Sequence, residues 1–261
     1  MPLLLTIDAG NTNTVLGVHE GSVLRAHWRL TTRREQTADE YGILVRNLFT
    51  ASGIEPGQIA GVALASVVPP LTSVLVALSR VYLGQEPLVV EPGVRTGMPI
   101  LYEPPSDVGA DRIVNGVAAF SAYGGPAIVV DFGTATTFDV VTRKGEYVGG
   151  VICPGIGISA DALFQRAARL PRVDVRHPGR VIGRSTVASI QSGLYFGYAG
   201  MIESMIQRIK AELQEPTRVV ATGGLAEALA ADIPSIEAVD AVLTLTGLRL
   251  IWERNRSGPA R

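Results

Sequence analysis

The sequence predicts an α/β protein built from two copies of one domain, each with a mixed β-sheet flanked by helices. First, an apolar run, a turn containing Asp, Gly and Thr, and two further strand-like runs occur in this order near the N terminus and again from residue 127. Second, the two turns begin at Asp8 and Asp131, a separation of 123 residues that is too long for a solenoid repeat. Third, segments with helical spacing of apolar residues lie between the strands.

The first half begins with an apolar run that ends at a polar turn. We expect strands over residues 3–7, 15–18, 23–30, 59–68 and 88–90, with turns at 8–13 and 20–21. A helix is expected from about residue 38, because the apolar residues between 41 and 48 have amphipathic spacing. Pro69-Pro70 ends the fourth strand, and Thr72 is expected to cap a helix that runs to residue 83.

The second half repeats the strand pattern and then becomes helical. We expect strands over residues 127–130, 138–141, 146–152 and 219–221, helices over 113–123, 159–170, 186–214 and 241–254, and a loop over 172–184. The long helix carries Gly193, Gly197 and Gly200, so it suits either a subunit interface or a buried position within one chain. We place the domains at 1–118 and 119–261, with a final helix that could pack back on the first domain.

Composition excludes several classes of function. The chain of 261 residues is 47% hydrophobic, and 23 Lys and Arg balance 24 Asp and Glu, so no basic patch for nucleic acid or an anionic membrane is expected. No apolar run reaches the roughly 18 residues of a membrane span, and we expect a cytoplasmic protein. The single cysteine, Cys153, excludes an intramolecular disulfide. The three histidines lack the spacing of a zinc site and are expected to be solvated or hydrogen-bonded.

The two Asp-containing turns have the chemistry of a phosphate site. They read Asp8-Ala9-Gly10-Asn11-Thr12 and Asp131-Phe132-Gly133-Thr134-Ala135. Glycine lets backbone N–H groups approach phosphate oxygens, and threonine adds a hydroxyl donor. A carboxylate repels phosphate, so a cation is expected between them. One such turn is a weak signal, but two in the same strand context indicate a nucleotide phosphate site.

A third candidate lies between these turns, in Gly109-Ala110-Asp111-Arg112. Asp111 precedes a predicted helix, so it is either an N-cap or a general base that accepts a proton from a substrate hydroxyl. Arg112 is either a surface residue or a group that binds a substrate carboxylate or a transferring phosphate.

These residues resemble one known family. The resemblance covers residues 3–255 and rests on ordered blocks. These blocks are Asp8–Asn13, Ser66–Pro70, Gly109–Arg112, Asp131–Thr137, Pro154–Ile156, Gln191–Gly193, Ala221–Ala226 and Leu243–Leu248. The chain is similar to type III pantothenate kinases, of the acetate kinase/sugar kinase/Hsp70/actin superfamily. The resemblance implies duplicated actin-like (ribonuclease H-like) domains with the active site in the interdomain cleft. It also implies phosphorylation of pantothenate by ATP, the first step of coenzyme A biosynthesis.

The resemblance also implies a role for each matching residue. Asp111 is the expected catalytic base, and Asp131 the ligand of a monovalent cation, K⁺ or NH₄⁺. ATP binding is expected from Asp8, Ala9, Gly10, Asn11, Thr12, Asn13, Thr14, Val15 and Thr134, with Asp8 holding Mg²⁺ directly or through water. Pantothenate contacts are expected from Tyr102, Gly109, Ala110, Asp111, Arg112 and Thr186.

Three further expectations concern the substrate site. Thr186 implies a homodimer, because in the family it reaches the substrate across a subunit interface. Pro104 and Ser185 stand where the family commonly has Asn, so both put the strength of pantothenate binding in question. Two other functions stay open at this point: a non-catalytic, transcription-regulating relative, and a kinase of the same superfamily with another small hydroxy substrate.

Overall fold

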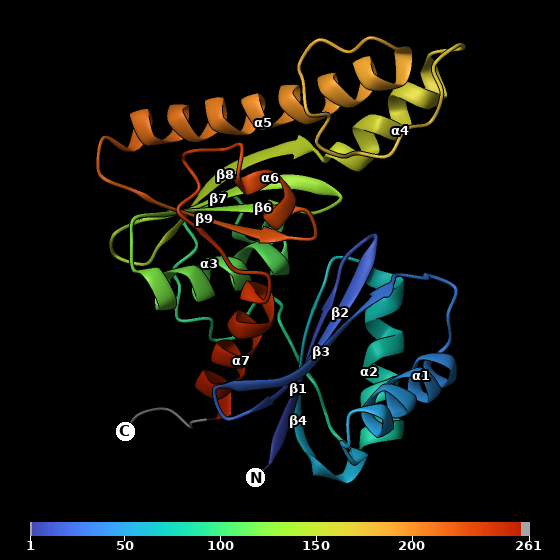
Figure 1. Cartoon of the computed structure of the whole chain (residues 1–261). Helices are drawn as coiled ribbons and strands as arrows, with labels where there is room; N and C mark the ends of the chain where they lie inside the picture. The colour runs from blue at the N-terminus through green and yellow to red at the C-terminus, as the bar shows by residue number, and fades with distance from the viewer. Residues whose placement is uncertain (1, 257–261) are drawn as a thin grey trace. The chain divides into compact units, whose positions relative to one another are not determined.

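The protein, described here from a computed structural model over residues 2–256, divides into two compact units. The first contains the chain up to Ala118 and again from Leu243, and the second contains Ala119–Val242. The chain passes from the first unit to the second within α3 (Ala110–Tyr123) and returns to the first with α7 (Leu243–Arg256) (Figure 1). No described helix is long and apolar enough to cross a membrane.

The first unit is built on a five-stranded mixed sheet in the order β3-β2-β1-β4-β5. Its strands are β1 (Leu3–Ala9), β2 (Asn13–Glu20), β3 (Val23–Thr31), β4 (Ile59–Ser66) and β5 (Leu88–Val89). The first three strands form an antiparallel meander, and β4 and β5 are parallel to β1 and β4 respectively. The antiparallel pairs need only short turns, whereas each parallel strand follows a helical crossover.

Helices cover both faces of the first sheet. α1 (Ala38–Ala51) and α2 (Pro69–Leu83) pack on one face, where β1, β2 and β4 contribute buried aliphatic residues such as Ile7, Leu16 and Leu64. α7 packs on the other face, and its Trp252 lies so close to β4 that a Cβ on Gly61 would be 2.3 Å from the indole ring. Gly61 is therefore required by packing, because a side chain there would displace α7.

The second unit repeats this topology in a sheet of order β10-β9-β6-β7-β8. Its strands are β6 (Ala127–Phe132), β7 (Ala135–Val141), β8 (Tyr147–Pro154), β9 (Arg218–Gly223) and β10 (Ala238–Val239). β6, β7 and β8 are antiparallel neighbours, while β9 is parallel to β6 and β10 is parallel to β9. Both sheets thus have the same strand order and direction, and the predicted fold class, two helix-flanked mixed sheets, is confirmed.

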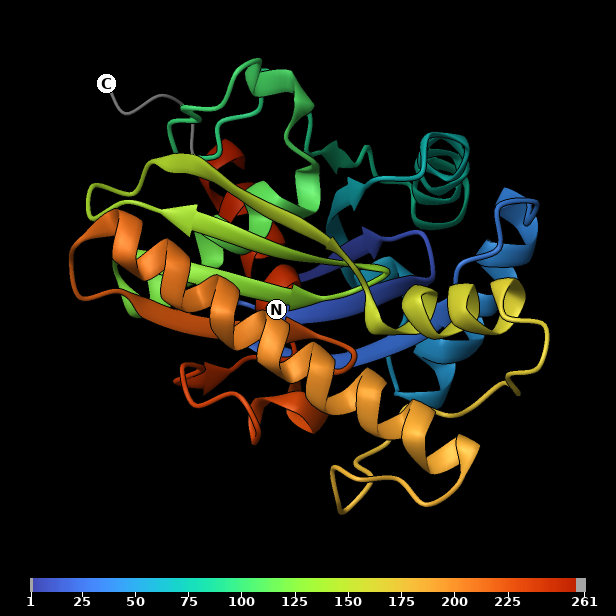
Figure 2. The ribbon, with the colours of Figure 1, turned by 90° about the horizontal axis from the view of Figure 1, so that it is seen from above.

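A 28-residue helix, α5 (Thr186–Leu213), crosses over the strands of the second sheet (Figure 2). Its residues Tyr195, Ile202 and Ile206 are buried against apolar residues of β6, β7 and β9. α4 (Ile156–Arg166) and α6 (Ala226–Ala230) complete the helices of this unit.

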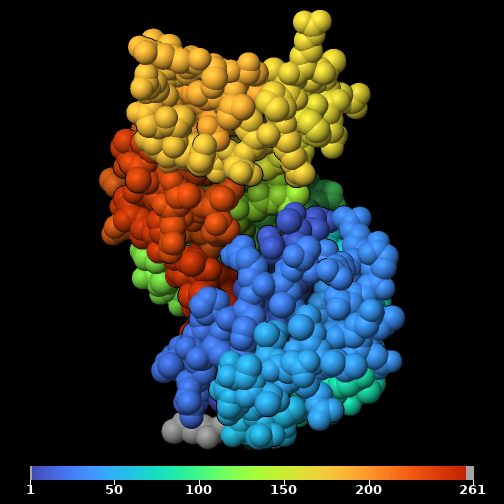
Figure 3. Space-filling view, turned by 45° about the vertical axis from the view of Figure 1, so that its right-hand side comes forward, coloured from blue at the N-terminus to red at the C-terminus, as the bar shows by residue number. Residues whose placement is uncertain are grey.

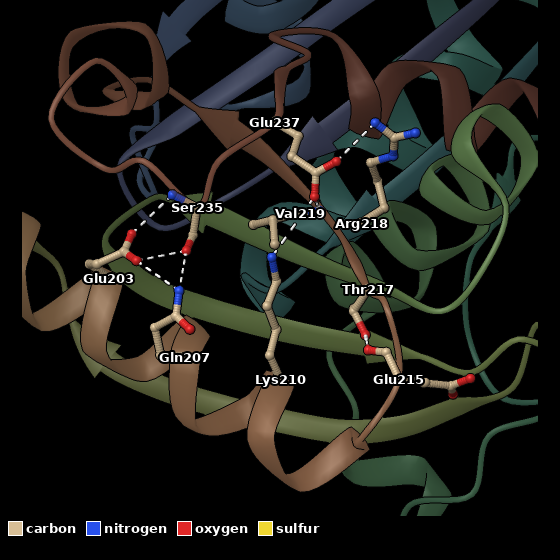
Figure 4. A network of polar contacts seen from close by, with 9 residues as sticks. All are labelled: Glu203, Gln207, Lys210, Glu215, Thr217, Arg218, Val219, Ser235 and Glu237. Atoms are coloured by element: carbon tan, nitrogen blue, oxygen red, sulfur yellow. Dashed lines mark hydrogen bonds and ion pairs between the residues drawn. The ribbon is translucent and has the colours of Figure 1, made fainter.

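Polar contacts fix the C-terminal half of α5 to the segment before β10 (Figure 4). Glu203 accepts hydrogen bonds from the Ser235 hydroxyl at 2.7 Å and from the Ser235 N–H at 3.0 Å, and Gln207 donates to the same hydroxyl at 2.7 Å. Burial raises the pKa of Glu203, but the hydrogen bonds from Ser235 and Gln207 outweigh it and hold the pKa below its ordinary value. The hydrogen bonds from Ser235 and Gln207 therefore favour the charged form of Glu203 in the folded protein.

Some local expectations are wrong at their boundaries. Thr72 is not a helix cap, because α2 begins three residues earlier at Pro69, and proline is favoured in the first turn, where its missing N–H has no helical partner. The Thr72 hydroxyl instead donates within the first turn, to Ser66 Oγ and the Val68 carbonyl. α4 starts and ends several residues before the predicted helix, with Gly155 at its N-cap and a loop from residue 167 to 185 after it.

Histidine 19 also differs from expectation. It is buried in β2, with 2% of its surface exposed, and neither ring nitrogen forms a hydrogen bond to a described residue. Burial and the nearby Arg249 lower its pKa from the ordinary value of 6.5 to about 4. His19 is therefore a neutral core residue at physiological pH, not the solvated or hydrogen-bonded group that was predicted.

Candidate active site

The first Asp-containing turn joins β1 to β2 and is closed by backbone hydrogen bonds. Asp8 and Ala9 are the last residues of β1, and the Gly10 N–H donates to the Asn13 carbonyl at 3.0 Å. A Cβ on Gly10 would lie 3.1 Å from that carbonyl oxygen, so the turn has little room for a side chain. Asn11 and Thr12 are exposed at its tip, which leaves their side chains accessible to a ligand.

Thr32, which the sequence analysis did not single out, braces this turn. It follows β3, and its N–H donates to the Thr12 carbonyl at 2.9 Å while its hydroxyl donates to the Gly10 carbonyl at 2.7 Å. The Thr32 and Thr14 hydroxyls are 2.9 Å apart and also share a hydrogen bond. These contacts fix the carbonyls of Gly10 and Thr12 and so hold the backbone of the turn in place. In the sequence, the signal that could have pointed to this role of Thr32 was a hydroxyl residue directly after the third strand.

The second Asp-containing turn joins β6 to β7 and has the same two backbone contacts. The Gly133 N–H donates to the Ala135 carbonyl at 3.1 Å, and the Gly155 N–H donates to the Thr134 carbonyl at 3.0 Å. Gly155 follows β8 as Thr32 follows β3, so Thr134 corresponds to Thr12. A Cβ on Gly155 would lie 2.2 Å from the Thr134 carbonyl oxygen, so this position requires glycine.

The strand neighbours of the two aspartates differ. Asp8 is paired with Val15 on β2 and Ala65 on β4. Asp131 is paired with Thr137 on β7 and Thr222 on β9, and a Cβ on Gly223 would lie 2.5 Å from Asp131 Oδ1. Paired residues on adjacent strands project from the same face, so Asp131 has hydroxyl groups on both sides where Asp8 has aliphatic ones.

Asp111 lies in the first turn of α3, one residue after the helix begins at Ala110. It is therefore not at the N-cap position, which corrects the structural alternative considered above. Its Oδ1 accepts a hydrogen bond from the Arg112 N–H at 2.8 Å, and a Cβ on Gly109 would lie 2.6 Å from the same oxygen. Glycine at 109 thus leaves room for the carboxylate, and the helix N-terminus favours its ionised form.

The Asp111 turn and the first Asp-containing turn meet at Val67. The Val67 N–H donates to the Ala9 carbonyl at 3.1 Å, and a Cβ on Gly109 would be 3.6 Å from Val67 Cγ1. Within the first unit, the structure therefore brings the predicted base to the same sheet edge as the predicted phosphate loop. The Asp8 turn follows the carboxyl end of β1, and Val67 follows that of the neighbouring parallel strand β4, at the edge where ligands bind in α/β sheets.

The predicted pantothenate residues have varied environments. Arg112 is buried, with 7% of its surface exposed, so its interpretation as a surface residue is wrong; Tyr102 is half-buried. Thr186 is the first residue of α5 and is exposed. Ser185, just before it, accepts a hydrogen bond from the Ala188 N–H at 3.2 Å and so caps α5. Serine and asparagine cap helices about equally well, so this departure from the family pattern preserves the helix start.

The donor sets fit different cations. Among residues 2–256 no group of three or more His, Cys, Asp or Glu side chains could hold a metal alone. Mg²⁺ is commonly held by one or two carboxylates together with waters and substrate phosphates, and Asp8 beside the first turn could supply one such carboxylate. Asp131, with Thr137 and Thr222 as its strand neighbours, offers the hard oxygen donors that an alkali cation prefers.

Comparisons with known proteins identify the family of this chain. The model of the type III pantothenate kinase family matches residues 4–208, which include every predicted site residue. The type III pantothenate kinase of Anaeromyxobacter dehalogenans (strain 2CP-C) is 57% identical over 97% of this chain and all of its own length. That of Moorella thermoacetica is 56% identical, again over 97% of this chain and all of its own.

Solved structures share the fold at lower identity. A Campylobacter jejuni protein described as a Baf family transcriptional activator has a TM-score of 0.61 at 19% identity, covering 97% of this chain and 98% of that one. An Arthrobacter inorganic polyphosphate/ATP-glucomannokinase has a TM-score of 0.53 at 15% identity, covering 98% and 99%. At these identities the likeness shows the fold alone.

Proposed function

The chain belongs to the type III pantothenate kinase family, and on that premise we propose that it transfers the γ-phosphate of ATP to the primary hydroxyl of pantothenate, the first step of coenzyme A biosynthesis. Family membership carries this proposal. It is supported by the meeting of the Asp111 turn and the Asp8 turn at Val67. A non-catalytic, gene-regulating relative would have no need to keep Asp8, Asp111, Arg112 and Asp131 together.

In this proposal the turn from Asp8 to Val15 holds the phosphate chain of ATP. Backbone N–H groups and the Thr12 hydroxyl at the exposed tip donate to phosphate oxygens. Asp8 holds Mg²⁺, directly or through water, and the ion would neutralise charge on the phosphates. Thr134 adds a contact to ATP from the second turn. That both turns serve one nucleotide stays a prediction.

Asp111 acts as the general base. As the pantothenate hydroxyl oxygen bonds to the γ-phosphorus, the bond from that phosphorus to the bridging oxygen breaks and ADP leaves. The hydroxyl proton passes to the Asp111 carboxylate. Gly109 keeps the space beside that carboxylate open, and the Arg112 N–H fixes one of its oxygens. Arg112, Tyr102 and Thr186 would hold the substrate, with the guanidinium suited to its carboxylate.

The Asp131 carboxylate is the proposed ligand of the monovalent cation. A monovalent ion supplies positive charge without the strict geometry of Mg²⁺, so it suits a structural and electrostatic role. Pro104 and Ser185 leave these assignments unchanged, since neither is a proposed catalytic group.

Homodimer formation is supported by exposed apolar residues on the second unit. They lie on β8, on α4, in the loop before α5 and at the start of α5. The group comprises Ile152, Ile158, Phe164, Val181, Ile182 and Val187, and Ile182 is 80% exposed. The yellow and orange surface in Figure 3, made by α4, the following loop and α5, forms one end of the second unit. Exposed apolar patches of this kind mark interaction sites, so we propose that a second copy covers this one.

The test is Asp111→Asn, assayed with pantothenate, ATP, Mg²⁺ and K⁺. We expect kcat to fall about 10²- to 10⁴-fold, because the amide cannot accept the proton. Asp107→Asn is the matched control: it removes an exposed carboxylate a few residues away and should leave kcat within about twofold. An Asp111→Asn rate within about threefold of wild type would exclude the general-base role. A panel of small hydroxy acids separates pantothenate from other substrates.

A further inference from the structure

Arg34 places a cationic side chain against the first Asp-containing turn. It lies three residues after β3, and its Nη2 donates to Asn11 Oδ1 at 2.9 Å. The side chain is exposed, and within residues 2–256 it forms no ion pair with a carboxylate. An arginine held by a neutral amide keeps its full charge for another partner. Neither Arg34 nor this contact was anticipated from the sequence.

Asn11, the hydrogen-bond partner of Arg34, is the residue that distinguishes the two turns. Seven positions separate Asp8 from its strand partner Val15, but six separate Asp131 from Thr137. Thr12 and Thr134 correspond, because their carbonyls accept equivalent backbone hydrogen bonds. The additional residue of the first turn therefore lies between Gly10 and Thr12, and it is Asn11. In the second unit the chain enters α4 directly after Gly155, so no residue there occupies the place of Arg34.

Charge favours an anion as the ligand of Arg34. The turn itself carries one carboxylate, Asp8, and the Mg²⁺ it would hold cannot balance both that carboxylate and a triphosphate. A guanidinium has five N–H donors in a planar fork that matches phosphate oxygens, and Asn11 uses only one guanidinium nitrogen. Because Asn11 fixes that nitrogen at the exposed tip of the turn, the rest of the fork is prepositioned at the predicted phosphate site.

We propose that Arg34 binds the phosphate chain of the nucleotide directly, and that Asn11 acts as its positioning residue. The inference rests on the proposed function of the first turn as the ATP site. It predicts a binding contribution that depends on the number of phosphates and does not extend to pantothenate.

The experiment measures nucleotide binding by calorimetry in the presence of Mg²⁺, together with KM for each substrate. Arg34→Gln should weaken ATP binding about tenfold or more, because a charge-assisted hydrogen bond to the phosphates is lost. AMP binding should change less than ATP binding, and KM for pantothenate should stay within about twofold. Arg33→Gln is the matched control, because it removes the same charge from the neighbouring exposed residue, whose side chain forms no hydrogen bond with the described residues of the turn.

Two variants separate phosphate binding from a purely structural tie. Asn11→Ala removes the contact but keeps the guanidinium, so it should weaken ATP binding less than Arg34→Gln does. Arg34→Lys should give an intermediate value, because it keeps the charge but loses the fork. Equal losses in Asn11→Ala and Arg34→Gln, or equal binding in Arg34→Gln and Arg33→Gln, would overturn the inference. Failure of the wild-type protein to phosphorylate pantothenate would instead overturn the proposed function.

Discussion

The two Asp-containing turns share a backbone frame but differ in almost every side chain around it. In both, the glycine N–H closes the turn and a threonine carbonyl accepts an N–H from the residue after the third strand. Around that frame, Asp8 has aliphatic strand neighbours and an arginine at the tip of its turn, while Asp131 has a threonine on each side and no arginine equivalent.

On the roles proposed above, the two copies of one motif would bind different ligands, and this difference gives the reason. The backbone contacts preserve the position of the carboxylate at the end of its strand. The neighbouring side chains then decide which ligand that carboxylate meets. A cationic tip suits the Mg²⁺-bound phosphates, whereas a carboxylate between hydroxyls suits a bare alkali cation. On the proposed roles, the ligand would thus be set by Asn11 within the first turn and by strand neighbours and Arg34 outside it.

The largest expected effect comes from removing each carboxylate in turn. Asp8→Asn should lower kcat/KM for ATP about 10²-fold or more and raise the Mg²⁺ concentration needed, because a metal ligand is lost. Asp131→Asn should change the dependence on K⁺ and leave the Mg²⁺ dependence near that of wild type. Rates measured over a grid of both cations test the assignment. If the two variants respond to both cations in the same way, the separation of roles fails.

The two units are also expected to differ in how their stability depends on pH. His19 on β2 corresponds in register to Val141 on β7, since they pair with Leu4 and Ala127 respectively. The pKa of His19 is lowered to about 4 in the folded protein, so the unfolded chain binds its proton more readily. The contribution of neutral His19 to the free energy of unfolding is fully present above pH 6.5. As the pH falls toward 4, at most about 3 kcal/mol of it is lost.

His19→Val, which copies the second unit, should reduce that loss of stability between pH 6.5 and 4. Urea unfolding at several pH values measures the effect, and His27→Val, at an exposed position on β3, is the control. If the free energy of unfolding of His19→Val falls with pH as steeply as that of the wild-type protein, His19 is not the cause of this pH dependence.

The smallest of these effects tests the backbone contacts that the two turns share. Gly155→Ala would place a Cβ 2.2 Å from the Thr134 carbonyl oxygen and 2.7 Å from that of Gly133, so the free energy of unfolding should fall by about 1–3 kcal/mol. Gly157→Ala, two residues later in α4, meets no atom within 4 Å and should stabilise the helix by up to about 1 kcal/mol. Thermal or denaturant unfolding compares them. Equal stability of the two variants would show that the second turn can shift without cost.

Local patterns in the sequence located every described strand except β10 (Ala238–Val239), and they marked both aspartates and Asp111 as candidates. An apolar run followed by a polar Gly-containing turn is a signal confined to adjacent residues, so it is visible without the fold. The bracing of the first turn was not visible, because Thr32 and Arg34 meet Gly10 and Asn11 across more than 20 residues. The one-residue difference between the turns also needed strand register, which the Asp and Gly positions do not reveal. The lowered pKa of His19 depends in part on Arg249 of α7, which is more than 200 residues away along the chain.

The return of α7 to the first sheet has a consequence for how the protein is made. The second unit is one continuous stretch, Ala119–Val242, so all of its strands and helices exist once residue 242 has left the ribosome. The first unit, although it starts the chain, lacks the helix that covers the face bearing Gly17 and Gly61 until residue 256 is synthesised. The half that is translated first is therefore the half that is finished last, and one face of its sheet stays uncovered by α7 during that interval.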